Sequence, residues 1–91
     1  MTIEKTLEER AKTHGAFADN ADVSQSMKII LQGSRNWERL TYTQREALDM
    51  IVHKIARIVN GDANHVDSWH DIAGYATLVE DILTGAQNNA S

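Results

Sequence analysis

Acidic side chains at helical spacing are the first feature of this sequence that could do chemistry. Asp71 lies in the segment Asp71-Ile72-Ala73-Gly74-Tyr75-Ala76, in the middle of a predicted apolar helix face. At about 100° per residue, Leu78 and Ile82 project on either side of it. Because burying an unpaired carboxylate is costly, Asp71 is expected to pair with a cationic group or to bind a cation.

A second set of candidate metal ligands comes earlier in the chain. Glu46-x-x-Asp49 is followed one turn later by His53, and this spacing places the three side chains along one side of a helix. Mg²⁺ and Mn²⁺ favour carboxylate oxygens and retained waters. If the two helices run antiparallel, Asp71 lies near Asp49 and His53. We therefore predict a metal site formed by Glu46, Asp49 and Asp71.

Each acidic residue also has a structural interpretation. Glu46 would close a capping box with Thr43, and Asp49 would form a surface pair with His53. Asp71 would form a buried ion pair with a basic residue of the neighbouring helix, namely His53, Lys54 or Arg57. The sequence alone leaves both interpretations open.

A basic break between two predicted helices is the other candidate site. Arg10 and Lys12 precede His14-Gly15-x-Phe17. Such a break offers backbone amides and positive charge to a phosphate. The alternative is a helix C-cap with Phe17 filling the core. Tyr75 could stack on a base or pack in the core. The predicted ligand-binding residues are Lys12, His14, Lys54, Arg57 and Tyr75.

The elements that must position these residues are helices. The chain has no proline, and apolar residues recur at helical spacing within the segments 3–12, 19–32, 43–59 and 67–83. The second helix is expected to end at Gly33 and the third at Asn60-Gly61, and Asp67 or Ser68 is expected to cap the last helix. We expect an all-α fold, a compact four-helix domain over residues 1–85 whose last two helices form an antiparallel hairpin. Residues 86–91 are expected to form a flexible tail.

Composition narrows the classes of function. The chain has 91 residues, five aromatic side chains, no cysteine and a formal net charge of −4. The missing cysteines exclude disulfides and thiolate metal sites, and the negative charge argues against binding duplex nucleic acid through phosphates. Neither a membrane-spanning run nor a signal peptide is predicted, so we expect a cytoplasmic protein. A core this poor in aromatic residues favours self-association into a homo-oligomer.

Two stretches of the sequence carry a resemblance. The run Gln44-Arg45-Glu46-Ala47-Leu48-Asp49-Met50-Ile51-Val52-His53-Lys54-Ile55-Ala56-Arg57-Ile58 is followed by Trp69-His70-Asp71-Ile72-Ala73-Gly74-Tyr75-Ala76. Together with Thr13-His14-Gly15-x-Phe17 and Asn36-Trp37, they resemble a family of small, all-helical proteins common in bacteriophages and prophages. The resemblance extends from about residue 10 to residue 83.

The acidic pairs are also distantly similar to the MazG-like, all-α nucleoside triphosphate pyrophosphatases. In that superfamily, acidic motifs on two adjacent helices hold Mg²⁺ against the triphosphate. Glu46 and Asp49 match part of the first motif, and Asp71 matches the second. The sequence departs from the pattern at Arg45, which replaces one acid, and in the spacing of Asp67-x-x-x-Asp71.

The resemblance implies a phage-encoded, Mg²⁺-dependent nucleotide pyrophosphohydrolase. The metal held by the three carboxylates would polarise the phosphate bridge, and His53 would act as a ligand or proton acceptor. Basic residues such as Lys54, Arg57, Arg10 and Lys12 would neutralise the phosphates. One alternative is a non-catalytic protein that binds and sequesters a nucleotide. Another is an acidic adaptor that binds a host protein.

Overall fold

The fold was analysed in a computed structural model, which describes residues 2–85. Four α-helices follow one another along the chain: α1 (Ile3–His14), α2 (Phe17–Gln32), α3 (Tyr42–Asn60) and α4 (Val66–Thr84). A single 3-10 turn, η1 (Trp37–Arg39), lies between α2 and α3, and residues 2–85 contain no strand. The predicted all-α class and the four helices are confirmed. The tail predicted at 86–91 lies outside the described residues.

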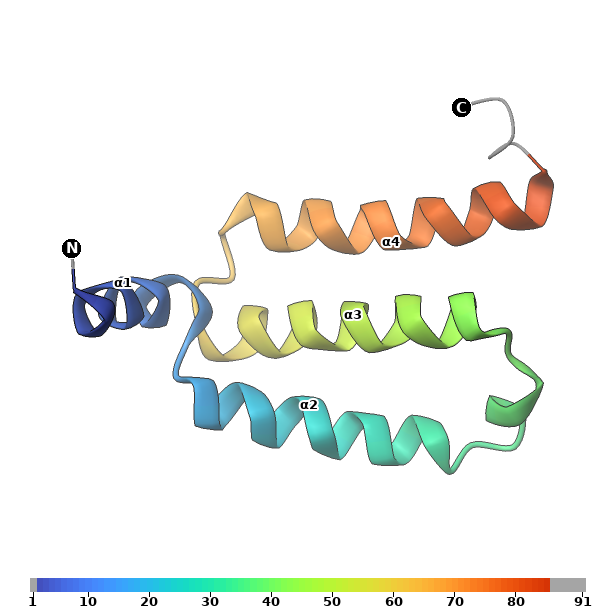
Figure 1. Ribbon diagram of the computed structural model, residues 1–91, viewed down its shortest axis with the longest axis horizontal. Coiled ribbons are helices and arrows are strands. Elements are labelled where there is room, and N and C mark those ends of the chain that lie inside the picture. Colours follow the sequence, from blue (N-terminus) through green and yellow to red (C-terminus); the bar gives the residue numbers. More distant parts are fainter. Residues whose placement is uncertain (1, 86–91) are drawn as a thin grey trace.

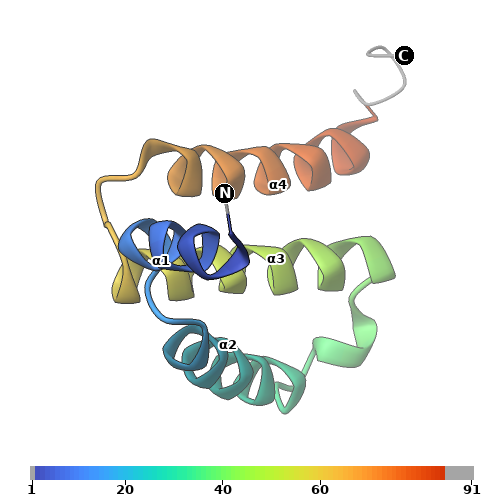
Figure 2. The ribbon, with the colours of Figure 1, turned by 60° about the vertical axis from the view of Figure 1, so that its left-hand side comes forward.

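Helix α3 is the centre of the fold. Figure 1 shows α4, α3 and α2 side by side as one layer, with consecutive helices antiparallel and α1 at one end. After a 60° turn, α1 lies in front of the layer (Figure 2). Helix α3 packs against each of the other three helices, and its pairing with α4 forms the predicted antiparallel hairpin. The two flanking helices α2 and α4 therefore contact opposite sides of α3.

Local sequence sets most of the helix ends, although two predicted caps are wrong. The capping box at the start of α3 is made by Thr41 and Gln44, not by Thr43 and Glu46. The residue before α4 is His65, and no side chain caps this end. Asp67 lies in the first turn of α4 instead, where its negative charge interacts favourably with the helix dipole.

The connections α1–α2 and α3–α4 cross each other in close contact, and glycine makes this possible. Gly15 caps α1 with φ of 82°, and a Cβ atom there would lie 2.4 Å from the Asn60 carbonyl oxygen. A Cβ atom at Gly61 would lie 2.3 Å from the Thr13 carbonyl oxygen. The backbone N–H of Asp62 donates to that same oxygen at 2.8 Å. The crossing therefore fixes α1 against the end of α3.

The single chain buries little of itself. The buried residues among 2–85 are small or β-branched: Ala47, Val52 and Ala56, with Ser24 and Ser68. The radius of gyration is 15.4 Å, whereas a compact domain of this length would have about 12 Å. The chain is thus more open than the compact domain that the sequence predicts. The expectation that Phe17 fills the core is also wrong, because this side chain is 86% exposed.

Candidate functional site

Asp71, the residue that suggested a metal site, forms an ion pair. Its Oδ2 atom lies 3.0 Å from Nζ of Lys54, whose side chain is only 12% exposed. The Asp71 side chain is 43% exposed and so lies at the edge of the α3–α4 contact, not in its middle. The structure therefore gives Asp71 one of the basic partners that the alternative interpretation named.

The other predicted metal ligands do not join Asp71. Nε2 of His53 lies 3.1 Å from Nζ of Lys28 on α2, so His53 is on the α2 side of α3, away from the Lys54–Asp71 pair. The Oδ1 atom of Asp49 is buried without a hydrogen-bond partner, and Glu46 is exposed. Within residues 2–85 no three His, Asp or Glu side chains lie close enough together to hold a metal ion. The described structure therefore does not bring the three predicted carboxylate ligands together.

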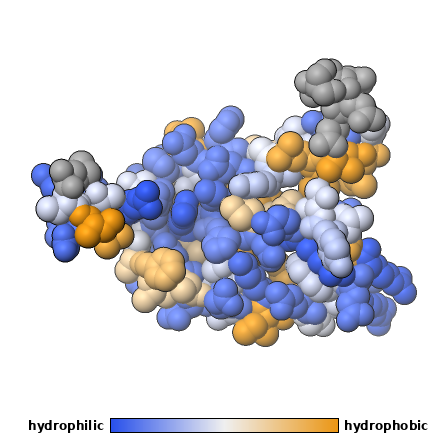
Figure 3. Space-filling model, viewed as in Figure 1, coloured by the Kyte–Doolittle hydropathy of each residue, from blue (hydrophilic) through white to orange (hydrophobic). Residues whose placement is uncertain are grey.

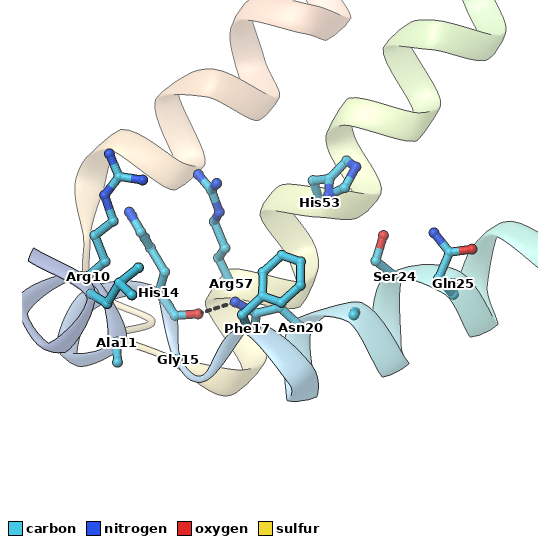
Figure 4. Close-up of a pocket in the computed structure, with 12 residues that line it drawn as sticks. Arg10, Ala11, His14, Gly15, Phe17, Asn20, Ser24, Gln25, His53 and Arg57 are labelled. Carbon is cyan, nitrogen blue, oxygen red and sulfur yellow. Dashed lines mark hydrogen bonds between the residues drawn. The ribbon is translucent and has the colours of Figure 1, made fainter. Parts of the chain in front are cut away.

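A pocket opens instead where α1, α2 and α3 meet, on the same side as His53. Its volume is about 410 Å³, which lies within the usual range of small-molecule sites. Figure 4 shows the side chains of Arg10, His14 and Arg57 directed toward the same side, with the Phe17 ring beside them. His53 and Ser24 stand further along the pocket (Figure 4).

Hydrogen bonds around the crossing hold this pocket in shape. Nδ2 of Asn20, on α2, donates to the carbonyl oxygen of His14 at 2.7 Å, and Figure 4 shows this bond. Nδ2 of Asn60, on α3, donates to Oδ1 of Asn20 at 3.1 Å. One asparagine thus links the end of α1 to the end of α3. The pocket walls are positioned by the same contacts that hold the two connections together.

The pocket is basic in a protein of formal net charge −4. Its lining includes the guanidinium groups of Arg10 and Arg57 and the rings of His14 and His53, and it includes no Asp or Glu side chain. Neither arginine forms an ion pair with any residue of the range 2–85. Positive charge is therefore concentrated in this pocket and left uncompensated.

Both histidine rings are held toward their neutral form. Burial, followed by the charge of Arg57, lowers the pKa of His14 below the ordinary value of 6.5. Partial burial and the charge of Lys28 lower the pKa of His53, with Asp49 opposing the shift. The Lys28 ammonium group donates to Nε2 of His53, which leaves Nδ1 to carry the proton of the neutral ring. An anion in the pocket would favour protonation of both rings.

Two polar atoms of the pocket lining have no hydrogen-bond partner among the described residues, and one aromatic ring of the lining is exposed. Ser24 is 2% exposed, and its hydroxyl has no hydrogen-bond partner among the described residues. The same holds for Nδ1 of His14. Leaving such groups unsatisfied usually costs about 1–3 kcal/mol each. Phe17 presents its ring to solvent at the pocket. The Phe17 ring is open to a ligand, whereas the two polar atoms are buried in the pocket wall.

The structure brings together part of the predicted ligand-binding set. His14, Arg57 and the predicted catalytic residue His53 line the pocket together with Arg10. Lys54 is paired with Asp71 on the α4 side, and Tyr75 lies beside Asp71 on a shallow surface of α4. Lys12 is exposed and outside the lining. Sequence reasoning missed Ser24, Asn20 and Gln25, because polar residues inside an amphipathic helix carry no distinguishing pattern.

Comparison with known families places the chain in one sequence family. A family model described as a domain of unknown function, DUF6378, matches residues 2–83. The chain belongs to this DUF6378 family. The match covers α1, α2, α3 and all of α4 except its last residue, and it includes the whole basic pocket of this DUF6378 domain. No curated protein and no solved structure matched the chain. In the described part of the domain, no helix is both long enough and apolar enough to span a bilayer.

Proposed function

We propose that this protein binds a nucleotide or a similar phosphate-bearing small molecule in the basic pocket, without hydrolysing it. The observation that carries the proposal is the uncompensated charge of Arg10 and Arg57 in a lining with no carboxylate. Guanidinium groups match phosphate oxygens with two parallel hydrogen bonds, and such charge-assisted bonds are stronger than neutral ones. A phosphate is therefore the ligand chemistry that this lining fits best.

The remaining groups of the pocket suit the rest of a nucleotide. The unpartnered hydroxyl of Ser24 is buried in the pocket wall, and after a local movement of that wall it would donate to or accept from a sugar or base. The exposed ring of Phe17 offers a face on which a base would stack. The volume of about 410 Å³ accommodates a mononucleotide. Phosphate at the arginines and base at Phe17 form one consistent orientation.

The pyrophosphohydrolase predicted from the acidic motifs is less well supported by the geometry. That reaction needs a metal held by Glu46, Asp49 and Asp71. The charge of Asp71 is already balanced by Lys54, and His53 is on the other side of α3. We therefore place nucleotide binding before nucleotide hydrolysis. The proposed setting, the cytoplasm of a bacterium that hosts the phage, rests on the resemblance of the sequence alone.

The test is a retention experiment with mass spectrometry. The pure protein is incubated with a pool of nucleoside mono-, di- and triphosphates and cyclic nucleotides, with and without Mg²⁺, and then filtered. We expect the protein to retain one nucleotide intact. The double variant Arg10→Ala/Arg57→Ala should bind that nucleotide at least about 100-fold more weakly, since each charge-assisted hydrogen bond contributes about 1.5–3 kcal/mol.

A matched control separates a pocket from general attraction to positive charge. The variant Lys5→Ala/Arg35→Ala removes the same charge at exposed positions outside the pocket, and it should retain the nucleotide as the wild type does. Equal loss of binding in both double variants would contradict the proposal. Release of a monophosphate and pyrophosphate would support the hydrolase instead. If nothing is retained or hydrolysed, the host-protein adaptor becomes the better hypothesis.

A further inference from the structure

One flank of the α3–α4 hairpin carries a run of apolar side chains. A groove between α3 and α4 is lined by Leu48 on one helix and by Ala76 and Val79 on the other, and no charged residue lines it. At about 100° per residue, Ile55 and Val59 continue the flank along α3 and Leu83 continues it along α4. We call this surface the apolar face; its residues are Leu48, Ile55, Val59, Ala76, Val79 and Leu83.

The apolar face is distinct from the basic pocket. By the same helical projection, His53 and Arg57, which line the pocket, leave α3 on the flank opposite to Leu48 and Ile55. Several side chains of the apolar face are open to solvent, with Val59 62% and Leu83 69% exposed. Figure 3 shows that hydrophobic residues also reach the surface at the C-terminal end of α4.

The area that the chain leaves exposed is large enough for an interface with a second copy. The accessible surface is 6772 Å² for a chain of 10.2 kDa, whereas a folded monomer of this mass exposes about 5,300 Å². The excess of roughly 1,500 Å² belongs to the whole chain, and it is larger than the ~800 Å² that each partner of a standard interface buries. The core of small residues leads to the same expectation, because oligomerisation is one way in which a small domain with little core gains stability.

We infer that the apolar face binds the apolar face of a second copy of this chain. The two α3–α4 hairpins pack face to face about a two-fold axis, so that each residue of the face contacts the same surface of the partner. In this dimer, the two helical layers bury their apolar faces against each other and form one shared core. It leaves the basic pocket on the outside of each subunit, so the dimer does not depend on the proposed ligand.

The test is the mass of the full chain in solution, measured by light scattering after gel filtration from 5 to 100 μM. We expect the wild type to have twice the chain mass of 10.2 kDa. The variant Val59→Glu/Leu83→Glu places charges in the buried interface and should weaken the dimer at least about 100-fold, leaving monomers throughout this range. Circular dichroism before and after concentration checks that the helices persist.

A control variant tests which surface is used. Ile29→Glu/Leu78→Glu adds the same charge at side chains that are 70% and 52% exposed on α2 and α4, outside the apolar face. This variant should remain a dimer. The inference is overturned if the wild type is a folded monomer at 100 μM, which would leave the face to a different protein. It is also overturned if the control dissociates while Val59→Glu/Leu83→Glu does not.

Discussion

The two sides of helix α3 use charge in opposite ways. On the α4 side, the carboxylate of Asp71 is paired with the nearly buried ammonium group of Lys54 at 3.0 Å. On the α2 side, Arg10 and Arg57 line a pocket without any carboxylate. The first arrangement holds two helices together. The second leaves two positive charges without an ion pair at a concave surface.

The difference teaches which unusual residues point to function. In the sequence, Asp71 looks functional because an acidic residue interrupts an apolar pattern. In the folded protein, its carboxylate is already paired with Lys54 and needs no ligand for its charge. Ser24 looks ordinary in the sequence, but its hydroxyl is buried without a partner. In this pocket, the unpartnered hydroxyl of Ser24 is therefore a better guide to a binding site than the paired carboxylate of Asp71.

The largest effect should come from the crossing that shapes the pocket. Gly15→Ala should destabilise the protein by about 3 kcal/mol or more, because the positive φ and the 2.4 Å approach to Asn60 both oppose a Cβ atom. Gly74→Ala is the control, because that helical position has open space. It should stabilise the fold by about 0.5–1 kcal/mol. Urea denaturation measures both, and equal effects would contradict the account.

Breaking the ion pair should have a smaller and purely structural effect. Asp71→Asn leaves the Lys54 ammonium group poorly compensated, and we expect a loss of about 1 kcal/mol in the free energy of unfolding, moderated by the exposure of Asp71. Nucleotide retention should be unchanged. Thermal denaturation and the retention assay check the two parts. Loss of retention with unchanged stability would assign Asp71 to the ligand site.

Removing the unpartnered Ser24 hydroxyl should weaken ligand binding without lowering the stability of the fold. Ser24→Ala deletes a buried group that has no hydrogen bond to lose, so the free energy of unfolding should stay within about 1 kcal/mol of wild type or rise. Affinity for the retained nucleotide should fall about threefold to tenfold, in line with the ~0.5–1.5 kcal/mol of a neutral hydrogen bond. Calorimetric titration measures the affinity. An unchanged affinity would remove Ser24 from the site.

The histidines predict two pH effects of opposite sign. Since the folded-state pKa values of His14 and His53 lie below the unfolded value of 6.5, the unfolded chain binds more protons near and below pH 6.5. Their contribution therefore lowers stability as the pH falls below 6.5. A bound phosphate raises these pKa values, so binding takes up protons and tightens over the same interval. Titration calorimetry in two buffers of different ionisation enthalpy detects the uptake, and none would contradict the site.

The sequence predicted the helices well because their signals are local. Apolar spacing and the stops at Gly33 and Gly61 placed four helices, with ends that differ from the structure by a few residues. It did not predict the register of α3 against α4. That register depends on side-chain packing and on the crossing of the connections, which places Asp71 opposite Lys54 and away from the Asp49 side. The basic segment between the first two helices was predicted from Arg10 and His14. The exposure of the Phe17 side chain was not predicted.

The most direct test is an amide NMR titration of the ¹⁵N-labelled protein with ATP and, separately, with inorganic pyrophosphate. We predict shifts centred on Gly15, Asn20, Ser24 and Arg57, which surround the pocket, and unchanged amides near Asp71. Pyrophosphate should perturb the arginine end and leave Phe17 unaffected. Shifts centred on Glu46, Asp49 or Asp71, or no shifts with either compound, would contradict the claim that the α2 side of α3 binds the phosphate ligand.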